Sequence, residues 1–229
     1  MLVAAIYSPP PPFAQQGQEG PPMLGTTTVV ALLISAIIPT GTAEFTSPPS
    51  GITVDVVTVN GSGCPAGTAS VAPSTDGRSF RVSFSDFLAQ SGPGAKPTDF
   101  RKNCQLSLRV SNADGMTYGI SRITYRGFGH LAAGAQGVQR ASYYFAGQSQ
   151  TTHRSHSFSG PFSDDWETSD SSANGDIAYS PCGDNRNLNI NSELRVVRGT
   201  SDVQAANFLA MDSTEGRVSA TYEFDWKSC

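Results

Sequence analysis

The stretch NLNINSELRV, residues 187–196, alternates like a β-strand that has one apolar and one polar face. Its apolar residues share one parity: Leu188, Ile190, Leu194 and Val196. Its polar residues share the other parity, and the first three are asparagines: Asn187, Asn189 and Asn191. A period of two predicts a half-buried strand. Asparagine is depleted in strands, so a row of three needs an explanation.

Two explanations of this asparagine row are open. In the structural one, which we favour, the amides hold neighbouring loops and strands together by hydrogen bonds. The preceding loop, PCGDNRN at residues 181–187, would need such anchoring. In the functional one, the amides bind a polar ligand such as a glycan, and an aromatic ring supplies a stacking surface. The rings expected to do so are Tyr143, Tyr144 and Trp166.

Other segments alternate in the same way and predict an all-β fold. Clear alternation occurs at residues 79–85, 105–110 and 217–227, and further strands are expected at 52–59, 118–127, 138–146, 152–159 and 206–211. In YGISRITYRG, residues 118–127, the apolar parity shifts between Ile120 and Ile123, which indicates a bulge. The best helix candidate, residues 84–92, is short. Short strands separated by turns predict a single-domain antiparallel β-sandwich of jelly-roll or related type.

The charge balance argues against nucleic acid as a partner. The chain has 229 residues, with 15 Lys+Arg against 19 Asp+Glu, and charged residues make up only 15%. A globular domain usually has about 25%. Because there is no basic excess to neutralise phosphates, we expect no binding to nucleic acid.

The N-terminal part predicts secretion. Residues 1–22 are rich in proline and glutamine and are expected to be a leader outside the fold, with Met23 as an alternative start. The apolar run at 29–38 suits a signal peptide and is too short to span a bilayer; the alternative is a buried strand. Small residues predict cleavage after Ala43. We therefore expect a signal peptide at 23–43 and one extracellular domain at 44–229, without a membrane span.

The cysteines are consistent with an oxidising compartment. Four occur, all after residue 43 and without a CxxC pair: Cys64, Cys104, Cys182 and Cys229. An even, widely spaced set predicts two disulfides. Three pairings are possible, and we prefer Cys64 with Cys104 and Cys182 with Cys229, because sequential pairs close the shorter loops. Each would contribute about 4 kcal/mol in the loop-entropy description.

Neither a metal site nor a cofactor site is predicted. The chain has three histidines, His130, His153 and His156, and the last two form the segment HRSH. Its flanks are rich in serine and threonine and predict a strand, in which side chains three apart point to opposite faces. One zinc ion is therefore not expected to bind both rings. No HExxH, GxSxG or phosphate-loop motif occurs either.

Acidic residues gather in SDDWETSDSSANGD, residues 163–176. Asp164, Asp165 and Glu167 could serve glycoside hydrolysis if they face a second carboxylate, such as Glu193, across a cleft. Residues 170–175 partly match a calcium loop, but its twelfth position is Pro181, so the EF-hand pattern fails. An irregular calcium site and a solvated acidic loop remain alternatives.

One modification site is predicted. Asn60-Gly61-Ser62 is an acceptor for N-glycosylation if the host is eukaryotic. An ordinary tight turn before Cys64 would require the same small and polar residues, so the two interpretations are compatible.

Seven blocks, taken in order, carry a resemblance to a known family: VNGSGCPAGT (59–68), KNCQLSL (102–108), YRGF (125–128), SYYFAGQSQT (142–151), GPFSDDW (160–166), SPCGDNRNLNINSELRV (180–196) and MDSTEGRVSATYEFDWKSC (211–229). Together with the four cysteines they resemble the secreted "domain of unknown function 4360" group of fungi and actinobacteria, over about residues 50–229. The resemblance implies a small secreted protein. It brings no activity, ligand or catalytic residue with it.

Three functions are compatible with these observations. We favour a secreted, non-catalytic binding or interaction domain, whose partner would be an extracellular glycan or protein. The second is an extracellular carbohydrate-active hydrolase that uses carboxylates of the 164–176 segment and Glu193. The third is a structural protein of the cell wall or surface that binds no small ligand.

Overall fold

The computed structural model describes residues 52–111, 115–173, 176–211 and 219–229. The expected leader, signal peptide and cleavage point lie outside these residues and stay predictions. The described residues form twelve strands: β1 Thr53–Asn60, β2 Ala69–Pro73, β3 Ser79–Phe84, β4 Leu88–Ser91, β5 Arg101–Ser111, β6 Met116–Leu131, β7 Gln136–Phe145, β8 Thr152–Ser159, β9 Phe162–Ser171, β10 Leu188–Val197, β11 Asn207–Ala210 and β12 Ala220–Ser228.

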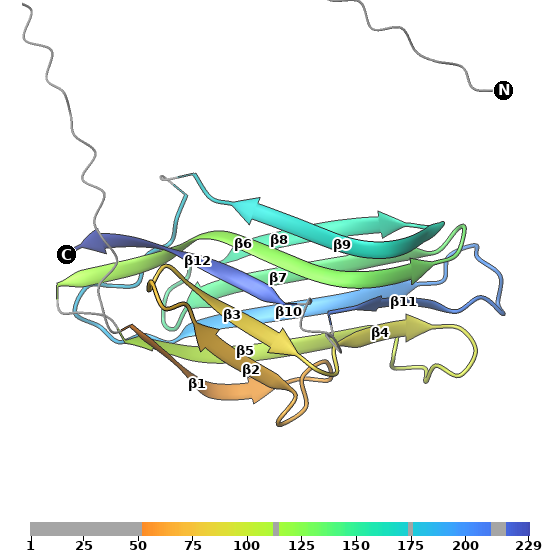
Figure 1. The fold of residues 1–229 in the computed structure, drawn as a ribbon, viewed down its shortest axis with the longest axis horizontal. Coiled ribbons are helices and arrows are strands. Elements are labelled where there is room, and N and C mark those ends of the chain that lie inside the picture. Colours follow the sequence, from red (N-terminus) through yellow and green to blue (C-terminus); the bar gives the residue numbers. More distant parts are fainter. Residues whose placement is uncertain (1–51, 112–114, 174–175, 212–218) are drawn as a thin grey trace, which may run out of the picture. The chain divides into compact units, whose positions relative to one another are not determined.

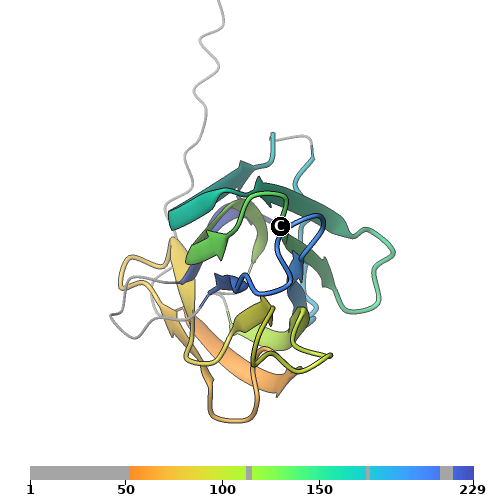
Figure 2. The ribbon, with the colours of Figure 1, turned by 90° about the vertical axis from the view of Figure 1, so that its right-hand side faces the viewer.

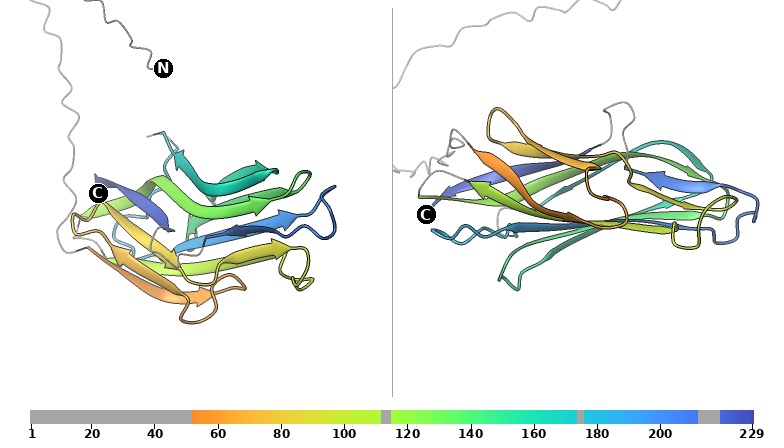
Figure 3. Two further views of the ribbon diagram at one scale, coloured as in Figure 1. Left: turned by 45° about the vertical axis from the view of Figure 1, so that its right-hand side comes forward. Right: turned by 90° about the horizontal axis from the view of Figure 1, so that it is seen from below.

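The strands form two antiparallel sheets that pack as a sandwich, as predicted (Figure 1). Sheet A has the order β1-β5-β10-β7-β8, so β10 lies at its centre. Sheet B has the order β2-β3-β12-β6-β11-β4, with β9 also paired to β6. The registers place β12 and β11 one after the other along one edge of β6, and β9 along the other edge. The right-hand view of Figure 3 shows the two layers from the side, and Figure 2 shows them end on.

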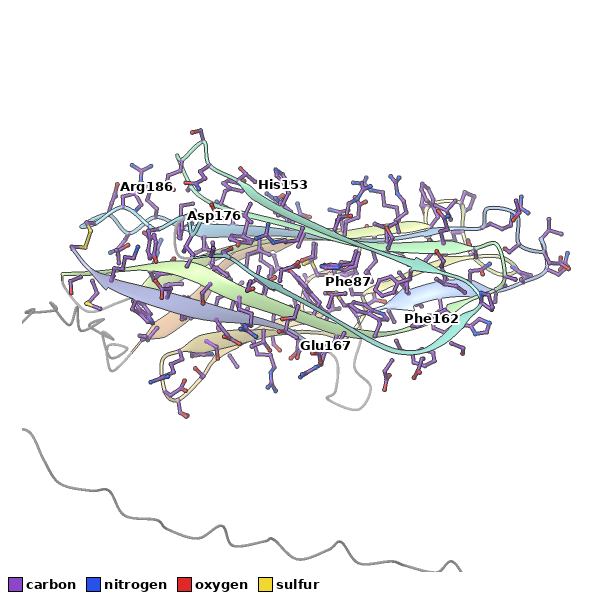
Figure 4. All side chains as sticks on the ribbon, turned by 90° about the horizontal axis from the view of Figure 1, so that it is seen from above. Phe87, His153, Phe162, Glu167, Asp176 and Arg186 are labelled. Atoms are coloured by element: carbon purple, nitrogen blue, oxygen red, sulfur yellow. A yellow bond between two sulfur atoms is a disulfide. The ribbon has the colours of Figure 1, made fainter. Side chains whose placement is uncertain are left out.

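The hydrophobic core lies between the sheets and follows from the alternation of the strands. The apolar parity of β10 is buried, and so are the matching parities of β3, β5, β6 and β12. Phe87 is fully buried and lies between the layers, whereas His153 and Glu167 point outward on opposite sides (Figure 4). The predicted bulge is present, because Glu223 pairs with Arg122 while the next residue, Phe224, pairs with Ile120.

The two disulfides have the preferred pairing. Cys64 is bonded to Cys104, with 5.3 Å between their Cα atoms, and this bond fastens the turn after β1 to β5. Cys182 is bonded to Cys229 at a Cα separation of 5.7 Å, and this bond joins the loop before β10 to the residue that follows β12.

Two segments differ from expectation. Most of the acidic segment 163–176, for which a solvated loop was one alternative, lies in strand β9, and the helix candidate at 84–92 contains strand β4. In β9 only Trp166 and Thr168 are buried, because the strand lies at the edge of sheet B and most of its other side chains face water. An edge strand of this kind lacks a continuous apolar parity, so its pattern resembles that of a polar loop.

Within the described ranges, no helix is long and apolar enough to cross a membrane.

Candidate functional site

The outer face of sheet A carries rows of polar side chains that cross four strands. The register aligns Gln105 of β5, Asn191 of β10, Ser142 of β7 and His153 of β8 in one row. The next row consists of Asn103, Glu193, Arg140 and Ser155. Side chains in such rows lie about 5 Å apart across neighbouring strands and share one face. The face is therefore an ordered array of amide, hydroxyl, imidazole, carboxylate and guanidinium groups.

The asparagine row points outward from this face and is half-buried. Asn187 donates its amide N–H to the hydroxyl of Ser107 at 3.1 Å, which ties the loop before β10 to β5. Neither Asn189 nor Asn191 has a side-chain hydrogen bond to another described residue. The structural explanation therefore applies to Asn187, whereas the other two amides keep their donors and acceptors for solvent or a ligand.

A hollow of about 520 Å³ lies beside the asparagine row on this face, and we call it the sheet A hollow. It is open to solvent, as the exposure of Arg140 and His153 on its wall shows. Its lining comes from all four strands β5, β10, β7 and β8, and includes Asn103, Ser142 and Asn191.

Glu193 lies at the centre of a group of three arginines on this face. Its Oε2 atom accepts a hydrogen bond of 2.6 Å from Nε of Arg101. Its Oε1 atom lies 3.9 Å from Nη1 of Arg140 and 3.9 Å from Nε of Arg195, too far for a hydrogen bond. The Glu193 side chain is 15% exposed, and those of Arg101 and Arg140 are about half exposed. One carboxylate thus faces three guanidinium groups, which we call the arginine cluster.

The three expected stacking residues do not act together. Tyr143 and Trp166 are buried in the core, 4% and 5% exposed, and Trp166 packs against Phe158 with 5.3 Å between ring centroids. Burial leaves neither ring a free face for a ligand. Only Tyr144 reaches the outer face of sheet A, where it is half-buried and aligned with Asn189.

The HRSH histidines point to opposite faces of β8, as the strand period predicts. His153 is exposed at the sheet A hollow. His156 points inward, and its Nε2 atom lies 2.8 Å from Oδ2 of Asp170 in β9. Arg154 also approaches Asp170, with 3.8 Å between Nε and Oδ1. These contacts bridge the two sheets where β8 and β9 form their edges. No group of three His, Cys, Asp or Glu side chains in the part that the structure describes is arranged to hold a metal ion.

The structure separates the carboxylates proposed for hydrolysis. Glu193 faces outward from sheet A, whereas Asp165 and Glu167 face outward from sheet B, and Asp164 is exposed on the other face of β9. Packed sheets lie about 10 Å apart, so both layers of the sandwich stand between Glu193 and the two outward carboxylates, Asp165 and Glu167. Asp170, the first residue of the partial calcium loop, contacts His156 through its carboxylate. Residues 174–175 of that loop lie outside the described ranges.

Several polar side chains are buried inside the sandwich. The hydroxyls of Tyr125 and Tyr222 are 3.2 Å apart. Burial raises the pKa of Tyr222 to about 12 and that of Tyr125 well above its usual value, so both stay protonated and can donate. The side chain of Gln139 is fully buried, and neither its amide nitrogen nor its amide oxygen has a hydrogen-bond partner among the described residues. These three buried side chains are enclosed by the core and offer no open surface to a ligand.

Asn60, the predicted glycosylation site, is exposed at the end of β1. The hydroxyl of Ser62, the third residue of the acceptor motif, donates to Oδ1 of Asn103 at 3.2 Å. The register aligns Asn60 with Gln105, in the same row as Asn191. Glycosylation of Asn60 stays a prediction.

Sequence reasoning missed two groups. The arginine cluster was missed because its members come from three strands, and only strand register shows that they meet. A strip of three rings on the outer face of sheet B, formed by Phe128, His130 and Phe208, was also missed. The ring centroid of Phe208 lies 5.9 Å from that of Phe128 and 5.9 Å from that of His130. The sequence signal for the arginine cluster was the pair Glu193 and Arg195, at alternate positions of β10.

Comparison with known proteins places this fold in a family. Residues 50–229 match the family described as "Domain of unknown function (DUF4360)". The chain is also similar to an "Uncharacterized secreted protein" of Arthroderma benhamiae (strain ATCC MYA-4681 / CBS 112371), with 34% identity over 181 residues, which are 79% of this chain and 73% of the relative. The family match covers the whole sandwich and all four cysteines. The chain is a secreted, disulfide-bonded β-sandwich that belongs to the DUF4360 family.

Proposed function

We propose that this protein is a non-catalytic extracellular binding domain, and that its site is the outer face of sheet A around the sheet A hollow. The ligand is a glycan. The observation that carries the proposal is the outward-facing amide of Asn191, which lines an open hollow of about 520 Å³ and makes no hydrogen bond to another described residue. The amide of Asn189, two positions away on the same face of β10, makes none either.

The chemistry of the face suits a sugar. An amide both donates and accepts hydrogen bonds, as a sugar hydroxyl does, so an array of amides can bind several hydroxyls at once. Ser142 and Asn103 add further groups of this kind on the neighbouring strands. Because β10 is paired on both sides, the amides stand on a rigid support, and little conformational entropy is lost on binding.

The binding function is favoured over hydrolysis by the placement of the carboxylates. A glycosidase needs two carboxyl groups about 5–10 Å apart on one cleft. Glu193 has no such partner among the proposed residues, because those of β9 project from the other sheet. Its own neighbours are arginines.

A glycan array probed with the secreted protein tests the proposal. Asn191→Ala is expected to weaken binding about fivefold, since a hydrogen bond to a ligand is worth about 1 kcal/mol. Asn189→Ala should also weaken binding and leave the melting temperature nearly unchanged. The matched control is Thr221→Ala, which removes a half-buried polar group from the outer face of sheet B.

Two results would contradict the proposal. The first is the absence of binding to any glycan on the array. The second is that the Asn191→Ala and Asn189→Ala proteins bind like the wild type while Phe128→Ala loses binding. This result would place the site on the aromatic strip of sheet B.

A further inference from the structure

We infer that the sheet A hollow selects acidic polysaccharides, and that the arginine cluster binds the anionic group of the sugar. This inference rests on the proposed function, because it names the ligand class of the same site. Three observations support the inference: the charge of the arginine cluster, the unused hydrogen-bond donors of its arginines, and the combination of groups that line the hollow.

The first support is charge. Arg101, Arg140 and Arg195 surround a single carboxylate, that of Glu193, so the cluster keeps a net charge of about two positive units. The chain as a whole has a formal net charge of −4. General attraction therefore does not bring a polyanion to this protein. Binding of a polyanion has to come from a local site, and this cluster supplies one.

The second support is that two arginines have unused donors. The guanidinium group of Arg140 makes no hydrogen bond to another described residue and is about half exposed. The Nε atom of Arg195 is buried and has no hydrogen-bond partner among the described residues. Of these two arginines, Arg140 lines the sheet A hollow, so its free donors are open to an oxyanion of the ligand. Arg101, in contrast, is bonded to Glu193.

The third support is the combination of groups within one hollow. A guanidinium group offers a planar fork of N–H donors that matches the two oxygens of a carboxylate or sulfate. Asn103, Ser142 and Asn191 line the same hollow and suit hydroxyl groups of the same polysaccharide chain. The site therefore pairs an anion position with hydroxyl positions, which is the chemistry of a uronate or a sulfated sugar within a chain.

The experiment compares two acidic polymers with their neutral counterparts, using the secreted protein. Polygalacturonate is paired with its carboxyl-reduced form, and dextran sulfate with dextran, so that the two arms distinguish carboxylate from sulfate. We expect at least tenfold tighter binding to one acidic polymer than to its neutral counterpart, weakening as salt screens the charges.

Matched variants locate the effect. Arg140→Gln is expected to weaken binding of the acidic polymer at least tenfold, because a hydrogen bond to a charged group is worth about 1.5–3 kcal/mol. Arg81→Gln makes the same change in net charge on the outer face of sheet B and should leave binding unchanged. Equal melting temperatures would show that Arg140→Gln folds normally.

Three outcomes would overturn the inference. Equal binding within both pairs of acidic and neutral polymers would leave the proposed function in place and remove the acid selectivity. Equal weakening by Arg140→Gln and Arg81→Gln would mean that net charge, not the cluster, is responsible. Binding to neutral glycans alone on the array, with no binding to either acidic polymer, would also contradict it.

Discussion

Replacing Glu193 with glutamine tests whether one carboxylate organises the arginine cluster. The substitution keeps the size of the side chain and removes its charge, so that Arg101, Arg140 and Arg195 are left to repel one another on one face of the sheet. We expect the free energy of unfolding to fall by about 2 kcal/mol at low salt, which lowers the melting temperature by about 4–8 °C for a domain of this size.

The magnitude follows from three contacts. The hydrogen bond from Arg101 to Oε2, at 2.6 Å, is charge-assisted, but Arg101 is 49% exposed, so about 1 kcal/mol is appropriate. Arg140 and Arg195 each have a nitrogen 3.9 Å from Oε1, where the attraction is about 1 kcal/mol in water and larger beside a carboxylate that is only 15% exposed. The cost of desolvating Glu193 offsets part of this sum.

Glu167→Gln is the matched control. Glu167 accepts a hydrogen bond from Nε of Arg126 at 2.6 Å, the same geometry as the pair of Arg101 and Glu193. Both partners are about half exposed, however, and one arginine takes part instead of three. An exposed pair of this kind contributes about 0–1 kcal/mol. We therefore expect the control to melt close to the wild type.

Thermal melts of the three proteins decide the matter. They are compared at low salt and in about 1 M salt, where the Debye length is about 3 Å and exposed charges are screened. The difference between Glu193→Gln and wild type should shrink in high salt. Equal melting temperatures for Glu193→Gln and Glu167→Gln at low salt would refute the reasoning, because burial and the number of arginines would then have no effect.

Three further predictions concern the scaffold. Replacing both Cys182 and Cys229 with serine should lower the free energy of unfolding by up to about 4 kcal/mol, because their bond closes a long loop; an unchanged urea midpoint would contradict this. Gln139→Met should raise the free energy of unfolding by about 1–3 kcal/mol, since it removes a buried amide without partners among the described residues. A thermal melt checks this, and a lower melting temperature than that of the wild type would show that the amide is hydrogen-bonded. The Lys102 ammonium lowers the pKa of the Asp99 carboxyl from 3.8 to about 2. The stability that Asp99 contributes is therefore fully present above pH 3.8 and lost as the pH falls toward 2, and in Asp99→Asn melts this part of the pH dependence should disappear.

The sheets could be predicted from the sequence because strand formation leaves a local signal. In 187–196 and 217–227 every second residue is apolar, and the polar residues between them identify the outward face without any knowledge of the partner strands. The bulge beside Ile120 was visible for the same reason, as a break in that period. The disulfide pairing followed from loop length alone.

The site could not be predicted in the same way, because it depends on register and on which sheet each strand joins. Neither property is encoded in the period of a single strand. Trp166 and Tyr143 looked like free aromatic surfaces in the sequence, yet both parities on which they lie face the core. Glu193 looked like a partner for Asp165, and the sandwich places the two on opposite outer faces.

The asparagine row shows the division most clearly. Alternation in the sequence determined that Asn187, Asn189 and Asn191 share the polar face of a strand. Only the tertiary structure decided their roles, because a hydrogen bond needs a partner at the right distance. Pairing with β5 brings the hydroxyl of Ser107 within 3.1 Å of the Asn187 amide. Asn191 instead lines the sheet A hollow, and Asn189 is half-buried on the same outer face.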